Sequence, residues 1–259
     1  MREITSELLF TVCKNGPNRP RNGESREKYL GRQTHLHLNG KRLGSSAFPA
    51  GVCPLLRALY LYDNQIETLG GVGSLSQMTH LYAQNNRIGE IGPDMGGLSR
   101  LRTLYLDRNE LRSLAPLAPL CALQELHVAS QRLPPGEVLD ISPHALSAIR
   151  GLRILDLANN DLETTEGLAG CKSLVSVNLA KNRLGCLASV APLLSAAPLD
   201  ELDLRDNPVS AERQALDAVI VASPTLGRLN GRELTPSERP YLQQLHMRGQ
   251  RSMDLADSA

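Results

Sequence analysis

Residues 56–66 read Leu-Arg-Ala-Leu-Tyr-Leu-Tyr-Asp-Asn-Gln-Ile. Aliphatic residues stand at the first, fourth, sixth and eleventh places of this stretch, and asparagine stands at the ninth. The same spacing returns at 101–111, 152–162, 174–184 and 199–209, and with one or two departures at 33–43, 78–88 and 123–133. Eight registered copies indicate a tandem repeat rather than an ordinary globular core.

The period of the repeat predicts a stack of thin coils. The fourth-place residues are at 36, 59, 81, 104, 126, 155, 177 and 202, so the intervals are 22 to 25 residues apart from one of 29. One coil offers core side chains that contribute roughly 2 kcal/mol each. Its backbone ordering costs roughly 1 to 2 kcal/mol per residue, so a coil alone is unstable and must stack on its neighbours.

This L-x-x-L-x-L-x-x-N-x-L pattern is typical of leucine-rich repeats. We therefore predict an α/β fold, a right-handed solenoid with a curved parallel β-sheet on the concave face. Short helices, 3-10 turns and loops are expected on the convex face. The asparagine is expected to bond backbone groups of the turn that follows it and of neighbouring coils.

The pattern also divides the chain. We predict an N-terminal cap and flexible basic loop over 1–29, repeats over 30–209 with an insert at 131–141, a C-terminal cap over 210–236 and a tail over 237–259. Ser210 is expected to cap a helix that starts at residue 211, and Asn230 replaces the usual aspartate of the terminal cap motif. A second helix is expected from Pro143 to Arg150, after the insert, with Ser142 as its N-cap. The insert is either a functional loop or a lengthened convex helix.

Composition argues against several functions. Lys plus Arg number 28 and Asp plus Glu 27, so the net charge of +1 gives no general attraction to nucleic acid or membranes. The five cysteines stand far apart, without metal-binding spacing, and no apolar run is long enough to span a bilayer. Because common catalytic and nucleotide-binding motifs are also missing, we predict a monomeric non-enzyme with no cofactor, metal or small-molecule substrate.

Side chains that alternate with the buried leucines are expected on the concave face. Four of the six tyrosines and four of the six histidines fall there, and tyrosine is enriched in the hot spots of protein interfaces. Acidic residues follow towards the C-terminus and suit a partner with basic groups. The predicted partner-binding residues are His35, His37, Tyr60, Tyr62, His80, Tyr82, Tyr105, Asp107, Glu125, His127, Asp156, Asn178, Glu201, Asp203 and Arg205. The alternative is that these side chains merely cover the strands.

Segments 59–64, 79–86 and 125–137 resemble those of the protein phosphatase 1 regulatory subunit 42 family, also called testis leucine-rich repeat protein. The likeness covers roughly residues 30–235, and 125–137 is its most specific part because its Gln-Arg-Leu-Pro-Pro-Gly-Glu run is not a general repeat feature. It implies a cytoplasmic regulator of the protein phosphatase 1 catalytic subunit, associated with microtubules and the centrosome or cilium base, with tubulin or microtubule-associated proteins as further partners. No [KR]-[VI]-x-F docking motif is present, so a phosphatase would have to contact the solenoid.

Two other functions remain open from the sequence. One is an assembly factor or structural component of axonemal dynein, since similar repeats occur there. The other is a subunit of a ribonucleoprotein particle. A local basic run over 19–32 and the tyrosines favour the latter, but the concave face lacks the Lys and Arg stripe that phosphate binding requires.

Overall fold

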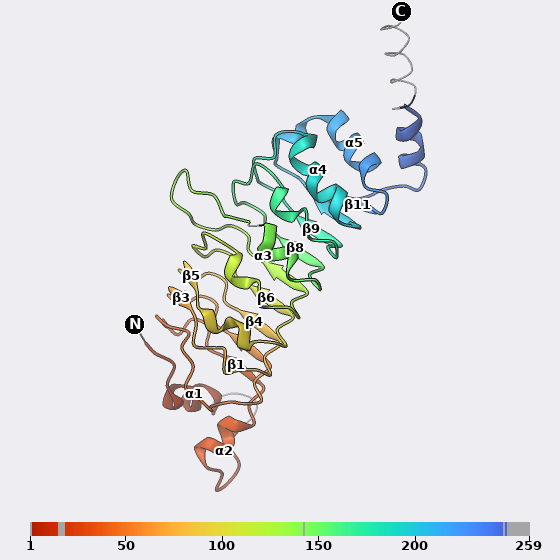
Figure 1. Ribbon diagram of the computed structural model, residues 1–259. Coiled ribbons are helices and arrows are strands. Elements are labelled where there is room, and N and C mark those ends of the chain that lie inside the picture. The colour runs from red at the N-terminus through yellow and green to blue at the C-terminus, as the bar shows by residue number, and fades with distance from the viewer. Residues whose placement is uncertain (1, 15–18, 142, 246, 248–259) are drawn as a thin grey trace, which may run out of the picture.

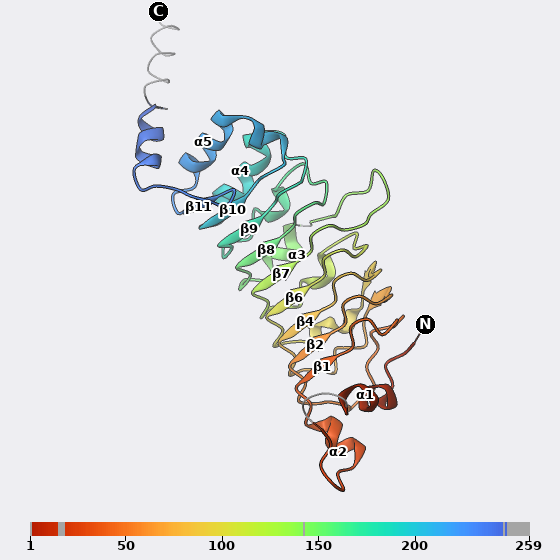
Figure 2. The same cartoon turned by 180° about the vertical axis from the view of Figure 1, so that it is seen from behind.

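The computed structural model describes residues 2–14, 19–141, 143–245 and 247. One long sheet runs along one side of the molecule, and helices and turns run along the other (Figures 1 and 2). Its repeat strands are β1 His35–His37, β2 Ala58–Tyr60, β4 His80–Tyr82, β6 Thr103–Tyr105, β7 Glu125–His127, β8 Ile154–Asp156, β9 Ser176–Asn178 and β10 Glu201–Asp203. All eight pair in parallel, each with the next in the chain. The predicted leucine-rich-repeat solenoid is confirmed.

Each repeat strand is centred on the fourth-place residue of one copy, so the predicted register is correct in every coil. In the β4–β6 pair, for example, Leu81 lies opposite Leu104 and Tyr82 lies opposite Tyr105. The fourth-place side chains are at most 1% exposed. The leucines therefore point into the core, and the residues on either side of them point to the other face of the sheet.

A ladder of buried asparagines ties neighbouring coils together. The Asn109 amide donates to the carbonyl oxygens of Leu106 (2.8 Å) and Ala83 (3.0 Å), and its Oδ1 accepts from the backbone N–H of Ile88 (3.1 Å). Gln131 takes this place in the fifth copy, where its amide donates to the Leu106 carbonyl at 3.0 Å. The longer side chain therefore preserves the ladder at the coil that precedes the insert.

The side opposite the sheet is built from short helices and turns, and the backbones of neighbouring coils approach each other closely there. They are η1 Pro93–Gly97, η2 Ala115–Leu117, α3 Pro143–Ser147, η3 Glu166–Leu168 and α4 Leu187–Ala196, with a small parallel sheet of β3 Thr68–Leu69 and β5 Glu90–Ile91. A Cβ atom at Gly97 would lie 2.3 Å from the Gly73 carbonyl oxygen, so this close approach requires glycine.

The insert forms a loop that leaves this side of the molecule (yellow-green in Figure 1). It is fastened to the preceding coil by the Arg112–Glu137 ion pair at 2.8 Å and by a bridge between Ser113 and Asp140. The helix after it ends at Ser147, so the predicted extension to Arg150 is wrong. Ser142, predicted as its N-cap, lies outside the described residues.

The N-terminal end of the core is covered by α1 Ser6–Cys13 and α2 Arg26–Gly31. Leu9 and Tyr29 are fully buried, and the rings of Phe10 and Tyr29 meet edge to face at 5.7 Å. α2 begins at Arg26, within the segment 1–29 predicted as N-terminal cap and flexible basic loop. Residues 15–18 of that loop lie outside the described part of the chain.

The C-terminal end is covered by η4 Pro208–Ala211, α5 Arg213–Ala222, and a hairpin of β11 Arg228–Leu229 and β12 Arg232–Glu233. Asn230 and Gly231 form its turn with φ of 55° and 77°, a backbone that this residue pair favours. β11 continues the long sheet beyond β10. The prediction that Ser210 caps the helix is wrong, because α5 begins after Glu212 and Ser210 lies within η4.

Candidate protein-binding face

The solvent side of the long sheet, called here the open face, corresponds to the predicted concave face. All fifteen residues predicted to bind a partner lie on its repeat strands or within two residues after them, and none is buried. That they contact a partner remains a prediction.

Five rings on the open face form one continuous stack, called here the aromatic ladder. Its members are His37, Tyr60, Tyr82, Tyr105 and His127. Neighbouring ring centroids are 4.3, 4.7, 5.1 and 4.1 Å apart, and the planes differ by no more than 22°. The His80 ring lies beside the stack, 6.4 Å from that of Tyr82.

The ladder follows directly from the strand register. Residues at the same place of neighbouring parallel strands lie about 4.8 Å apart, close to the stacking distance of aromatic rings. Because each inner ring has both of its faces covered by neighbours, a partner would meet ring edges and tyrosine hydroxyls. The sequence places these residues on one face, but the continuity of the stack emerges only from the coordinates.

The C-terminal end of the ladder is embedded in carboxylates. The His127 Nε2 lies 2.7 Å from Glu125 Oε1, and its Nδ1 lies 3.9 Å from Asp156 Oδ2. The Tyr105 hydroxyl donates to the same Glu125 oxygen at 2.9 Å. Asp107, on the coil before, accepts from the backbone N–H of Ala129 at 2.8 Å. We call Asp107, Glu125, His127 and Asp156 the acidic cluster.

This arrangement shifts the ionisation of its members. Burial acts to lower the pKa of the His127 imidazole, but the carboxylates of Asp156 and Glu125 outweigh it and raise that pKa above its ordinary value. Burial acts to raise the pKa of Glu125, but hydrogen bonds from His127 and Tyr105 keep it below its usual range. Burial, followed by the hydrogen bond to Glu125, raises the pKa of Tyr105. The cluster therefore favours a charged imidazole between charged carboxylates.

Farther along the open face, acidic residues are paired with arginines. Asp203 forms an ion pair with Arg205, and Glu201 lies 3.2 Å from Arg228 Nη1. Our sequence interpretation counted Glu201 and Asp203 as negative surface and overlooked Arg228, which follows them on β11. Unbalanced negative charge is therefore concentrated in the acidic cluster, where three carboxylates surround one histidine.

Within the described residues, no group of three or more His, Cys, Asp or Glu side chains is arranged to hold a metal ion. None of the helices described has the length and apolar character needed to cross a membrane. Val177, the central residue of β9, is buried, while the neighbouring Asn178 uses its Oδ1 to accept from the Ala180 backbone N–H. The open face thus offers ring edges, hydroxyls and carboxylates.

Comparisons with known proteins agree with this architecture. Residues 76–119 match the family model described as Leucine Rich repeats (2 copies). Solved structures with the same fold include the internalin inlF of Listeria monocytogenes (TM-score 0.59, 21% identity, 80% of this chain and 64% of that chain). Human 5T4, or trophoblast glycoprotein, is another, with a TM-score of 0.61, 24% identity and 76% of each chain covered.

Two curated proteins share closer sequence over shorter stretches. Centrosomal protein of 72 kDa from Mus musculus is 33% identical over 112 residues, which is 43% of this chain and 17% of that protein. Geranylgeranyl transferase type-2 subunit alpha from Rattus norvegicus is 37% identical over 70 residues, or 27% of this chain and 12% of that protein. The matches thus span less than a fifth of either relative. The repeat strands, the asparagine ladder and these likenesses together identify the chain as a leucine-rich-repeat protein.

Proposed function

We propose that this chain is a non-catalytic scaffold whose open face binds a globular protein, with the aromatic ladder at the centre of the contact. The observation that carries this proposal is the uninterrupted stack from His37 to His127. Stacked rings are already ordered, so binding them costs little additional side-chain entropy. Tyrosine edges and hydroxyls combine apolar contact with hydrogen bonding, as is common in the energetic centres of interfaces.

The acidic cluster supplies the second half of the recognition. Its three carboxylates exceed its one imidazole, so a partner with lysine or arginine opposite it gains complementary charge. Such pairs would speed association and orient the partner. We expect the partner's basic group to contact the end of the ladder beside His127, where Glu125 and Asp156 lie on both sides of the imidazole.

The partner we propose is the protein phosphatase 1 catalytic subunit, which follows from the resemblance of 125–137 to the regulatory subunit 42 family. We further propose action at the centrosome, microtubules or cilium base. The likeness of part of the chain to a protein named as centrosomal supports that location. Tubulin or microtubule-associated proteins are additional partners under this proposal.

Binding of the purified phosphatase catalytic subunit to the full chain, measured by isothermal titration calorimetry, tests the proposal. Removal of a hot-spot tyrosine by Tyr82→Ala is expected to weaken binding about 30-fold or more. Tyr241→Ala is the matched control, because Tyr241 is 61% exposed and lies outside the open face. Tyr82→Phe preserves the ring stack and separates the role of the hydroxyl from that of the ring.

Two results would contradict parts of this proposal. Equal affinities for wild type, Tyr82→Ala and Tyr241→Ala would place the contact elsewhere on the chain. Absence of phosphatase binding, together with capture of axonemal or centrosomal proteins that is lost in Tyr82→Ala, would retain the scaffold but replace the partner by a structural ciliary assembly. The centrosomal likeness and the lack of a short phosphatase-docking motif are what favour that second candidate.

A further inference from the structure

A row of exposed basic side chains lines the edge of the sheet at which the strands begin. We call this row the basic rim; its members are Arg57, Arg100, Arg102, Arg150, Arg153 and Lys172. Among the described residues, none of these six cations forms an ion pair. Six unpaired cations on one edge form a concentrated patch in a chain whose net charge is +1.

Some cations elsewhere on the solenoid are paired with carboxylates. Arg32, which precedes β1 at one end of the same edge, is paired with Glu24, and Arg228 on β11 is paired with Glu201. On the opposite edge, Arg183 is paired with Asp161 at 2.9 Å. The rim thus carries positive charge that no ion pair among the described residues balances, and unbalanced exposed charge is a feature of surfaces that meet an oppositely charged partner.

Two hollows lie along the rim. The first, of about 490 Å³, is lined by Arg57, Arg100 and Arg102 together with hydroxyl groups that include that of Thr79. No Asp or Glu is among its lining residues. It thus offers guanidinium groups and hydroxyl donors, the combination that recognises carboxylates.

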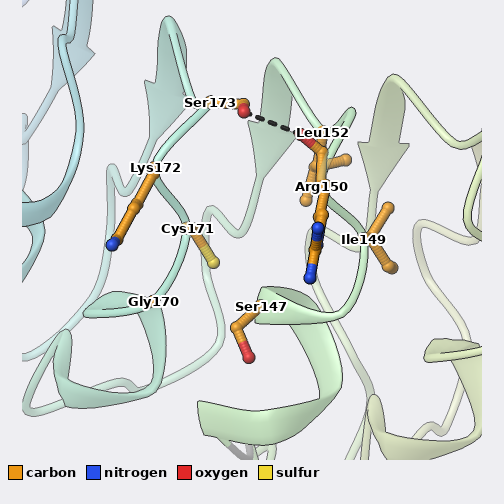
Figure 3. Close-up of a pocket in the computed structure, with 8 residues that line it drawn as sticks. All are labelled: Ser147, Ile149, Arg150, Leu152, Gly170, Cys171, Lys172 and Ser173. Carbon is orange, nitrogen blue, oxygen red and sulfur yellow. Dashed lines mark hydrogen bonds between the residues drawn. The ribbon is translucent and has the colours of Figure 1, made fainter.

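The second hollow, of about 410 Å³, lies between α3 and the coil that follows it (Figure 3). The side chains of Arg150 and Lys172 flank Cys171 in this view, and the Ser147 hydroxyl lies nearby. Its lining also lacks Asp and Glu. Burial raises the pKa of the Cys171 thiol to about 11, so this group stays neutral and does not oppose an anion.

The spacing of the rim distinguishes among anionic partners. Arg57, Arg102 and Arg153 occupy the same place on every second strand, so their backbones are separated by about 10 Å. A polypeptide in the extended polyproline II conformation advances about 3.1 Å per residue with three residues per turn, so every third side chain lies on one side, about 9.3 Å from the last and in step with this spacing. Nucleic acid carries its phosphates at a much higher density, about 3.4 Å apart along one strand, and would leave most of them unneutralised.

We propose that the basic rim is a second docking surface, which meets the open face only at His80, for an extended acidic segment of a partner protein. The segment runs along the edge of the sheet, across the strands, with its carboxylates in the two hollows. Contact with Arg57, Arg102 and Arg153 would fix its register. This proposal does not depend on the partner of the aromatic ladder.

Fluorescence anisotropy on the full chain tests the rim directly. The probe is a labelled peptide of about twelve residues with glutamate at every third position and serine elsewhere, a spacing that matches the rim when the peptide adopts the polyproline II conformation. The rim variant is Arg57→Gln/Arg102→Gln/Arg153→Gln. The matched control is Arg87→Gln/Arg108→Gln/Arg183→Gln, which removes three exposed arginines from the opposite edge and gives the same net charge.

We expect the wild-type chain to bind the peptide at low salt. The affinity should fall about tenfold in the rim variant and change less than about twofold in the control variant, since each exposed ion pair contributes modestly. Tyr82→Ala should bind the peptide like wild type, which separates this outcome from any failure of the open face. Equal losses in the two triple variants would overturn the proposal by showing general charge attraction. Absence of peptide binding would also overturn it, as would tighter binding of a single-stranded oligonucleotide that depends on the same three arginines.

Discussion

Asn109→Ala tests whether the asparagine ladder holds the coils together. Asn109 is fully buried, and its side chain serves four backbone groups on two coils, of which the Asp107 carbonyl is the most distant at 3.3 Å. The carbonyls of Ala83 and Leu106 each keep a second side-chain donor, from Asn86 and Gln131 respectively. Within the described residues, the Ile88 N–H has no partner besides Asn109 Oδ1, so the alanine variant leaves it buried and unsatisfied.

The magnitude follows from these contacts. An unsatisfied buried N–H costs about 1 to 3 kcal/mol, and each of the two weakened carbonyl contacts adds about 0.5 to 1.5 kcal/mol. We therefore expect a loss of about 3 to 4 kcal/mol in the free energy of unfolding. With a urea dependence of about 3 kcal/mol per molar, the midpoint of unfolding should fall by roughly 1 M.

Urea titration followed by far-UV circular dichroism measures this shift. Glu110→Ala is the control, because it alters the next residue of the same coil while leaving the backbone contact of Glu110 with Ile88 in place. We expect the control to change stability by less than about 0.5 kcal/mol. A loss below about 1 kcal/mol for Asn109→Ala would refute the prediction, because the hydrogen bonds of the asparagine ladder would then contribute little to stability.

Three further predictions concern separate features of the molecule. Gly97→Ala should lower the free energy of unfolding, measured by thermal melts, by more than about 2 kcal/mol because its Cβ would clash with the Gly73 backbone. Gly185→Ala, which has open space around it, should not, and equal effects would contradict the close approach of Gly97 to Gly73. Tyr82→Ala should remove two ring stacks and lower the free energy of unfolding by about 1 to 3 kcal/mol. It should also change the near-UV circular dichroism, which Tyr62→Ala, outside the aromatic ladder, should not; matching spectra would count against the aromatic ladder. NMR titration should give His127 a pKa above 6.5. Its contribution to stability is therefore full below pH 6.5 and disappears as pH rises through the folded pKa. The pKa of Glu125 is lowered, so its contribution to stability is instead lost as pH falls. A His127 pKa at or below 6.5 would contradict the acidic cluster.

The repeat strands were predictable because one physical constraint fixes them. Leu59 and Leu104 must point inward for a coil to bury anything, and strand alternation then determines which face every neighbour occupies. The same argument places Tyr60, Tyr82 and Tyr105 on the open face from the sequence alone. Only the spacing of the repeat was needed.

Features that depend on neighbouring coils were harder to predict. Ser210 looked like a helix cap, but Pro208 starts a 3-10 turn that delays α5 to Arg213. The pairing of Glu201 with Arg228 joins residues 27 apart in sequence, and it emerges only once β11 is added to the sheet. The continuous overlap of the rings likewise depends on side-chain rotamers, which periodicity does not encode.

The basic rim was missed for a related reason. The repeat pattern relates residues at equivalent strand positions. The rim instead combines residues that precede the strands with residues of separate turns, such as Arg100 and Lys172, and only the stacking of the coils brings them onto one edge. In a solenoid each coil contributes to several surfaces at once, and residues on different edges share few contacts. Substitutions on the rim and on the aromatic ladder should therefore act additively on binding, because neither set passes through the side chains of the other. If both proposals hold, this arrangement would let one small repeat protein bind a basic surface of one partner and an acidic segment of another at the same time.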